Sequence, residues 1–275
     1  MRYQLILFLL FISQVVIADT QLISSKIVPG GIFIADIATV NQPCPKAQYQ
    51  NTRVMVVPHH GHWFAVLGIP MDTKSGIHEL EVLFADQTKR AIDFVVPKPK
   101  RIGKGKAQLI RIKDKRLVTP DWATQQKIQL EAERIKTIYA NWSEDAPQSL
   151  HFSRPVRGKI TSGFGWGRVF NRVKPNWHQG IDIAAHKGTY VRSPAAGEII
   201  NADRYVLTGN TVFVDHGQGL ITCYCHLDKI LVTEHAKIKR GQIIGTVGTT
   251  GRSTGPHLHW GVVLNQAKVN PKLFI

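Results

Sequence analysis

Residues 255–260 read Gly-Pro-His-Leu-His-Trp, and this stretch is the most informative of the chain. The Gly-Pro step predicts a turn, and the apolar residues after it predict a short strand. Alternate residues of a strand point to the same face, so the side chains of His257 and His259 should project together. Two neutral imidazoles on one face can bind a metal ion or transfer protons. Taken alone, the pair is equally compatible with a surface strand that carries two histidines.

A possible partner segment contains His178 and Asp182, four residues apart with Gly180 between them. Both side chains can reach one ion if the chain turns there or extends along a groove, although this spacing is common by chance. A catalytic zinc ion needs three protein ligands and one open position for water. His178, Asp182 and His259 would supply two imidazoles and one carboxylate, and His257 would lie near the metal but not on it.

Residues 220–227 form a third candidate segment, which we predict to be a strand. Alternation places Tyr224 and His226 on one face and Cys223 and Cys225 on the other. His226 would then be a second histidine near the metal, free to accept a proton or to stabilise charge during hydrolysis. The cysteines would point away from it, so we interpret them as small buried apolar groups rather than zinc ligands.

The cysteine content sets a limit on disulfide pairing. The chain has three cysteines, so at least one thiol stays free. Cys223 and Cys225 would lie roughly 6–7 Å apart with nearly parallel Cβ directions, which suits a disulfide poorly. Cys44 has no assigned role.

The segment from about residue 155 to residue 275 resembles the M23 metallopeptidases, the lysostaphin/LytM-type peptidoglycan endopeptidases. The resemblance covers this whole C-terminal segment, and several motifs occur in the family's order. They are Ser-Gly-Phe-Gly at 162–165, His-x-x-x-Asp at 178–182, Lys-Gly-Thr-Tyr-Val at 187–191, Ala-Gly-Glu-Ile at 196–199, Tyr-x-His-Leu at 224–227, Lys-Arg-Gly-Gln-Ile-Ile-Gly at 239–245, the run 250–259 and Val-Asn-Pro at 269–271.

The resemblance implies His178, Asp182 and His259 as zinc ligands, and His226 and His257 as catalytic histidines. Zinc would lower the pKa of its water and polarise the scissile carbonyl, while the two histidines act as general base and as stabiliser of the tetrahedral intermediate, in an order that the sequence does not assign. Some family members have lost ligands and only activate other cell-wall enzymes. Here all five positions are filled, which favours an active peptidase.

The resemblance therefore implies a zinc-dependent endopeptidase of peptidoglycan that acts in cell-wall remodelling. Similarity to proteins of Gram-negative bacteria favours the D-Ala–diaminopimelate cross-link over a glycine bridge. The alternatives are a non-catalytic wall-binding activator of an amidase and a general protease.

The pattern of short strands predicts a mainly β fold. In the C-terminal domain, residues 151–275, frequent glycines separate short apolar runs, which is typical of an antiparallel sheet or barrel-like domain. Most of these glycines would form tight turns. Gly251 and Gly255 flank the entry to the histidine pair and are candidates for close approach to a substrate backbone.

Residues 19–100 are predicted to form a small β-sandwich-like domain. It is similar to the N-terminal domain that precedes the catalytic domain in some M23 proteins, above all around residues 63–70. His59, His60 and His62 invite interpretation as a metal site, but no acidic or thiol partner lies nearby in sequence. We therefore interpret them as exposed histidines at a hairpin turn. The predicted strands are 27–31, 31–38, 52–57, 63–69, 76–85 and 91–96.

The connection, residues 101–150, combines a basic stretch with a helix. Lysines and arginines between positions 98 and 116 face one acidic residue, Asp114, so the stretch is either a solvated linker or a patch for anionic wall or membrane polymers. Thr119 as N-cap, Pro120 at the first position and Asp121 in the first turn predict the start of a helix over 120–142.

Apolar side chains recur on this helix at Ile128, Ala132, Ile135 and Tyr139, and they should pack on one domain. The helix would join two β-rich domains. Connectors of this kind can hold a precursor closed, so we hypothesise that the N-terminal module shields the zinc groove until it is displaced or cleaved.

Residues 1–18 are predicted to be a signal peptide: Arg2 precedes an apolar core, and Val-Ile-Ala at 16–18 offers a cleavage site. A retained anchor is less favoured because the apolar run is short and interrupted. Export to the periplasm is expected, with secretion or outer-membrane association as the alternatives. The net charge of +16 then favours anionic wall or membrane polymers over nucleic acid, or it only maintains solubility. We expect a monomer.

Overall fold

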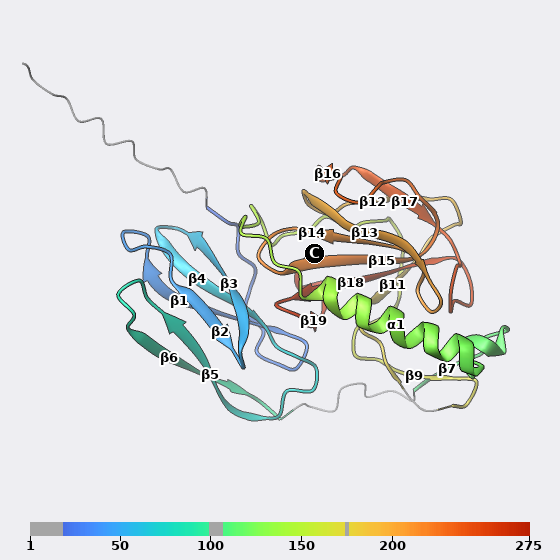
Figure 1. The fold of residues 1–275 in the computed structure, drawn as a ribbon, viewed down its shortest axis with the longest axis horizontal. Coiled ribbons are helices and arrows are strands. Elements are labelled where there is room, and N and C mark those ends of the chain that lie inside the picture. The colour runs from blue at the N-terminus through green and yellow to red at the C-terminus, as the bar shows by residue number, and fades with distance from the viewer. Residues whose placement is uncertain (1–18, 99–106, 174–175) are drawn as a thin grey trace, which may run out of the picture.

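The computed structural model describes residues 19–98, 107–173 and 176–275 (Figure 1). The predicted signal peptide and the basic residues 99–106 lie outside these ranges. The described residues form two β-rich bodies with one long helix, α1, along the second (Figure 1), so the predicted mainly β fold class is confirmed. In the described part of the chain, no helix has the length and apolar character needed to span a membrane.

The N-terminal body is one antiparallel sheet with the strand order β1-β4-β3-β2-β5-β6. The sheet curls so that its two edge strands approach each other, since Phe33 of the first strand stacks on Phe94 of the last with ring centroids 4.5 Å apart. It encloses its own apolar core, as expected of the predicted sandwich-like domain. The strands are β1 (Ile32–Thr39), β2 (Lys46–Tyr49), β3 (Thr52–His59), β4 (His62–Gly68), β5 (Gly76–Leu83) and β6 (Lys89–Val96).

Two details of this sheet differ from the prediction. Residues 27–31 are not a strand: the Gly31 N–H donates to the Val28 carbonyl at 2.7 Å and closes a turn. Strand β2 was not predicted, since it offers only Ala47 and Tyr49 as inward-facing residues. Four residues with two apolar side chains give too weak a signal of alternation to identify a strand.

The connection contains β7 (Gln108–Ile110), the 3-10 turn η1 (Lys115–Leu117) and α1 (Trp122–Tyr139). The predicted N-cap was wrong: Asp121 caps the helix, and its carboxylate accepts from the Thr124 N–H at 2.8 Å. Of the predicted apolar face, Ala132 is exposed, and packing occurs only in the C-terminal half, where Ile135 and Tyr139 contact the second body.

The C-terminal body is built on an antiparallel sheet with the order β16-β13-β14-β15-β18-β11-β8, and β7, β9 and β10 form a small separate sheet beside it. The central strands β15 and β18 are almost wholly buried, so the sheet gives the site a rigid floor. The elements are β8 (Ile160–Ser162), β9 (Gly167–Phe170), β10 (Asn176–Trp177), β11 (Ile181–Ala184), β12 (Tyr190–Arg192), β13 (Gly197–Tyr205), β14 (Gly209–Asp215), β15 (Leu220–Ile230), β16 (Lys237–Ile238), β17 (Ile243–Val247), β18 (His257–Leu264), β19 (Ala267–Val269) and the 3-10 turn η2 (Pro271–Leu273).

Besides the separate core of the N-terminal sheet, the two bodies also share a second apolar cluster. Met55 and Val66 of the N-terminal sheet belong to the same buried cluster as Val262 and Leu264 of β18. Strand β4 approaches so closely that a Cβ at Gly68 would lie 2.5 Å from the Leu264 carbonyl oxygen. This contact is at the far end of β18 from its histidines, about 17 Å along the strand from His259 at ~3.3 Å per residue.

Candidate metal centre

The pairing of β11 with β18 brings the first candidate residues together. In this antiparallel pair Asp182 lies opposite His259, and Ala184 lies opposite His257. Directly opposed residues of paired strands share a face, so the carboxylate of Asp182 and the imidazole of His259 meet without any loop rearrangement. His178 precedes β11 and its ring points to the same place.

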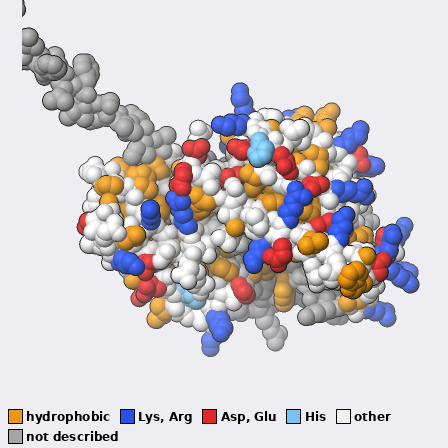
Figure 2. Space-filling model, viewed as in Figure 1, with side chains coloured by type: hydrophobic (Ala, Val, Ile, Leu, Met, Phe, Trp, Pro, Cys, Tyr) orange, Lys and Arg blue, Asp and Glu red, His pale blue; other side chains and the backbone are white. Residues whose placement is uncertain are grey.

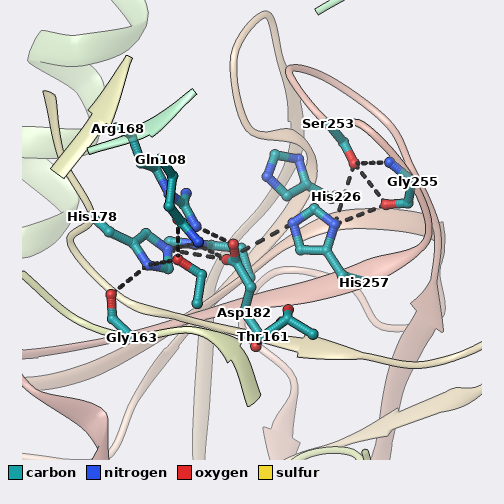
Figure 3. A network of polar contacts seen from close by, with 12 residues as sticks. Gln108, Thr161, Gly163, Arg168, His178, Asp182, His226, Ser253, Gly255 and His257 are labelled. Atoms are coloured by element: carbon teal, nitrogen blue, oxygen red, sulfur yellow. Dashed lines mark hydrogen bonds and ion pairs between the residues drawn. The ribbon is translucent and has the colours of Figure 1, made fainter. Parts of the chain in front are cut away.

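The three predicted ligand atoms form a small triangle (Figure 3). The distances are 3.0 Å from His178 Nε2 to Asp182 Oδ1, 3.0 Å from His259 Nδ1 to the same oxygen, and 2.9 Å between the two nitrogens. Ligands at about 2.0–2.1 Å around a tetrahedral zinc ion would be about 3.3 Å apart. Among the described residues, this is the one group of histidine, cysteine and acidic side chains close enough to hold a metal ion.

The surrounding backbone fixes the orientation of these ligands. His178 Nδ1 lies 2.9 Å from the Gly163 carbonyl oxygen and must donate to it, which leaves the lone pair of Nε2 for a metal. Gly180 has no room for a side chain, because a Cβ there would lie 2.8 Å from the His259 ring. The glycine between His178 and Asp182 therefore lets β18 come close enough to complete the triangle.

His226 and His257 lie beside the triangle (Figure 3). Their ring centroids are 4.9 Å apart, and His257 Nε2 is 3.8 Å from Asp182 Oδ1. His226 Nδ1 lies 2.8 Å from the Thr250 carbonyl oxygen, and His257 Nδ1 lies 2.8 Å from the Gly255 carbonyl oxygen. Each carbonyl holds a proton on Nδ1, so each Nε2 carries the lone pair of the neutral ring.

Burial sets the charge state of the centre. It lowers the pKa of His178 to about 4 and that of His226 to about 3, and it also lowers the pKa of His257. Burial alone would raise the pKa of Asp182, but hydrogen bonds from His178 and His259 outweigh it and hold that pKa well below its ordinary range. Neutral imidazoles and an ionised carboxylate are the forms in which these side chains bind zinc.

Sequence reasoning missed Arg168. This residue of β9 donates to Asp182 Oδ2, the carboxylate oxygen that is outside the triangle (Figure 3). The pair is buried, with side-chain exposures of 13% and 11%. Gln108 of β7 also lies beside the centre and accepts from Ser162 Oγ at 2.9 Å. No motif marked either residue, since both come from short strands that meet only in the folded chain.

The predicted facing of the β15 cysteines was wrong. Cys225 pairs in register with His259, so the cysteines share the face of the metal triangle. His226 joins that face because its positive φ of 62° interrupts the alternation at a bulge. Tyr224 points to the opposite face, into the core with Trp260.

Two glycines were predicted to approach a substrate backbone. Gly251 instead packs on the chain itself, since a Cβ there would lie 2.4 Å from the Gly209 nitrogen. Nothing lies within 4 Å of a Cβ built at Gly255, so space for a ligand remains only there.

Comparison with known proteins identifies the family. Residues 176–271 match the model of peptidase family M23, and residues 25–98 match the model of the M23 N-terminal domain. A crystal structure of a Pseudomonas aeruginosa protein assigned to peptidase M23 has 37% sequence identity and a TM-score of 0.73, covering 91% of this chain and 95% of that one. The chain therefore belongs to peptidase family M23.

Curated relatives match over less than half of this chain. The peptidoglycan DD-endopeptidase ShyA of Vibrio cholerae is 39% identical over 137 residues, 48% of this chain and 31% of that protein. The DD-carboxypeptidase/endopeptidase Mpg of Neisseria meningitidis is 42% identical over 118 residues, 42% of this chain and 27% of that protein. The match thus spans about a third or less of each relative.

Proposed function

We propose that this chain is a zinc-dependent endopeptidase that hydrolyses peptide cross-links or stems of bacterial peptidoglycan, with the D-Ala–diaminopimelate bond as its target. One observation carries the proposal. Three ligand atoms lie within 3.0 Å of one another, and the two histidines beside them both keep Nε2 available. Such a set provides three ligands, an open coordination position and two proton-handling groups.

The metal would be held by His178, Asp182 and His259. When bound, zinc supplies Lewis acidity: it polarises a carbonyl and lowers the pKa of a coordinated water. Arg168 holds the second carboxylate oxygen of Asp182, which fixes the carboxylate plane and leaves Oδ1 aimed at the two imidazoles.

The remaining chemistry falls to His226 and His257. Because burial lowers both pKa values, both rings are neutral at pH 7 and can accept a proton at Nε2. One ring would take the proton of the attacking water at Nε2 and then pass that proton to the leaving amine. The other ring would donate to the developing oxyanion only after its own Nε2 has gained a proton from solvent. His257 is the better candidate for the base, since its Nε2 lies 3.8 Å from Asp182 Oδ1 and so closest to the metal ligands.

The substrate class is proposed from the relatives, because ShyA and Mpg are both named as endopeptidases that act on DD bonds or peptidoglycan. The competing function is a non-catalytic activator of a wall amidase. Such a protein would not need both Nδ1 atoms held by backbone carbonyls beside a complete ligand set. A general protease would need the same centre but would not discriminate between D- and L-peptide bonds.

Such a substrate implies a location outside the cytoplasm, and we propose the periplasm. We also propose the domain division 19–100, 101–150 and 151–275, a monomeric state and binding of anionic wall or membrane polymers to the basic surface. On the face seen in Figure 2, Lys and Arg side chains are spread over both bodies and alternate with Asp and Glu. On this face, the distribution supports weak, delocalised attraction of a polyanion.

The proposal is tested by digesting purified sacculi with the zinc-loaded full chain and analysing the products by mass spectrometry. Cross-linked dimers should disappear as monomers with a free D-Ala carboxylate accumulate, and chelation or His257→Ala should stop the reaction. Intact sacculi together with stimulation of an added amidase would instead favour the activator. Equal hydrolysis of casein would favour a general protease.

A further inference from the structure

A cationic side chain that the proposed mechanism does not use lies in the loop that orients both catalytic histidines. This loop, residues 248–256, provides the carbonyl oxygens of Thr250 and Gly255, each 2.8 Å from a histidine Nδ1, and Ser253 Oγ lies 3.3 Å from His257 Nδ1. Arg252 lies between these contacts in sequence. The side chain of Arg252 therefore extends from the loop that orients both histidines.

The conformation of Arg252 is well defined. Its backbone N–H donates to the Leu207 carbonyl at 2.8 Å. Its guanidinium carbon lies 4.2 Å from the centroid of the Phe170 ring, a stacking contact that holds the guanidinium in place. Phe170 and Arg168 are alternate residues of β9 and therefore share a face. Because Arg168 reaches Asp182 from that face, the Arg252 guanidinium is on the same side of the centre.

The two arginines differ in their partners. Arg168 is paired with Asp182. Within the described ranges, no carboxylate lies within 4.0 Å of the Arg252 guanidinium, and its nitrogens donate to no side chain or carbonyl; the salt bridges that do form involve other residues. Burial, and then the proximity of Arg168, lower the pKa of Arg252, but a guanidinium stays charged at neutral pH.

A half-buried cation that has no anionic partner within the protein can bind an anionic group of a ligand. Stacking on Phe170 occupies one flat face of the guanidinium and leaves its edge, with its N–H donors, available. That edge matches the two oxygens of a carboxylate.

We propose that Arg252 binds the free carboxylate adjacent to the scissile amide, and so selects cross-links that carry one. This inference rests on the proposed function. In a D-Ala–diaminopimelate cross-link, the carbon that bears the amide nitrogen also bears a free carboxylate, three bonds from the carbonyl carbon under attack. A glycine bridge has no carboxylate at this position, and an amidated diaminopimelate has lost its charge. Arg252 would thus be a specificity-determining residue rather than a catalytic one.

The test measures binding in a His257→Ala background, where the peptide is not consumed. Two cross-linked stem-peptide dimers serve as probes, one with the diaminopimelate carboxylate next to the amide free and one with it amidated. Each is titrated into the zinc-loaded full chain, with Arg252→Gln, Arg252→Lys and the exposed control Arg240→Gln added to that background.

The free-carboxylate dimer should bind about ten- to a hundredfold more tightly than the amidated one, the range of a charge-assisted hydrogen bond. Arg252→Gln should remove this preference, Arg252→Lys should restore part of it, and Arg240→Gln should leave it intact. Equal affinity for the two dimers, failure to bind either, or an equal loss for both in Arg252→Gln would overturn the inference. The proposed function is judged separately, by whether the wild-type chain hydrolyses the dimers.

Discussion

Two regions of this chain contain several histidines at close spacing, but the histidines are exposed in one region and buried in the other. At the β3–β4 hairpin, His59 pairs in register with His62 across a turn at His60, which confirms the predicted hairpin. His60 is 81% exposed and His62 is 43% exposed. In the C-terminal body, His178 is 2% exposed.

The difference lies in how carboxylates are shared. Hairpin His62 pairs with Asp36 at 2.8 Å, while His60 lies 3.9 Å from a different residue, Asp19. In the metal centre a single oxygen of Asp182 lies 3.0 Å from ring nitrogens of both His178 and His259. Histidine density alone therefore does not bring possible ligand atoms together; convergence on one buried carboxylate does, and there we propose the metal site.

The largest effect should come from removing that shared carboxylate. Asp182→Ala should abolish hydrolysis of sacculi and the stabilisation of the fold by added zinc. That stabilisation should be about 2.7 kcal/mol in the wild type at a free zinc concentration of about 100 Kd. Thermal unfolding with and without zinc measures it. Asp36→Ala, which removes the β1 partner of hairpin His62, is the matched control and should keep both properties, so zinc stabilisation of Asp182→Ala would break the comparison.

Removing a histidine that does not bind metal should separate chemistry from binding. His257→Ala and His226→Ala should each lower the rate of hydrolysis about 10²- to 10⁴-fold, because a positioned proton-transfer group is lost, while zinc content stays unchanged. The exposed His235 provides the control substitution. Full activity in His257→Ala would contradict the assignment.

Arg168 extends this comparison, because in the described residues no arginine pairs with Asp19 or Asp36, the carboxylates beside the hairpin histidines. Arg168→Gln should weaken zinc affinity about 10- to 100-fold by freeing the Asp182 carboxylate to rotate. Arg168→Lys should weaken zinc affinity by an intermediate amount. Arg172→Gln, on the exposed end of the same segment, should leave zinc affinity unchanged. Competition with a zinc chelator measures each affinity; an unchanged affinity in Arg168→Gln would show that the ion pair does not orient the ligand.

A buried histidine outside the metal centre tests how burial alone changes the pH dependence of stability. His216 is held by the Ala196 carbonyl and Thr222, and burial lowers its pKa to about 4. The unfolded chain protonates this group near pH 6.5, but the folded chain does so only near pH 4, so its contribution is present above 6.5 and lost as pH falls through this window. The free energy of unfolding should fall by about 2 kcal/mol from pH 7 to pH 5 because of this residue.

Urea unfolding at both pH values measures the effect, with His216→Asn compared with the wild type. Between pH 7 and pH 5, the free energy of unfolding of His216→Asn should fall by about 2 kcal/mol less than that of the wild type. An identical pH dependence in the two proteins would mean that His216 is not buried in the neutral form.

The smallest effect should come from the hairpin. His60→Gln with His62→Gln should change the free energy of unfolding by less than about 1 kcal/mol and leave hydrolysis unchanged, because exposed ion pairs contribute little. Circular dichroism measures the free energy of unfolding, and the sacculus assay measures hydrolysis. A large loss of activity would mean that this hairpin has a role that its exposure does not indicate.

Sequence patterns predicted those residues of the centre whose relative positions follow from their spacing along the chain. The alternation of His257 and His259 and the spacing of His178 and Asp182 required only that two strands pair, and β11 and β18 do so. The facing of His226 could not be predicted, because its side depends on a bulge with φ of 62° rather than on period two. Arg168 lay beyond prediction for a different reason, since its partner Asp182 is reached only through tertiary contact.

The predicted arrangement of the domains was also incomplete. Two β bodies and a helix were predicted from composition and turns, but their shared core of Met55, Val66, Val262 and Leu264 was not. Apolar strand residues look alike whether they face their own sheet or a neighbour. The proposed shielding of the groove by the N-terminal module remains a prediction. Gln108 of β7, in the connection between the two bodies, lies beside the centre.

Zinc content after exhaustive dialysis tests the central claim most directly, measured on the full chain, on His178→Ala and on the double hairpin variant His60→Gln/His62→Gln. If one buried carboxylate with converging imidazoles makes the site, the wild type and the hairpin variant should each retain one zinc ion per chain, and His178→Ala should retain almost none. Retention of zinc by His178→Ala, or its loss from the hairpin variant, would contradict the account.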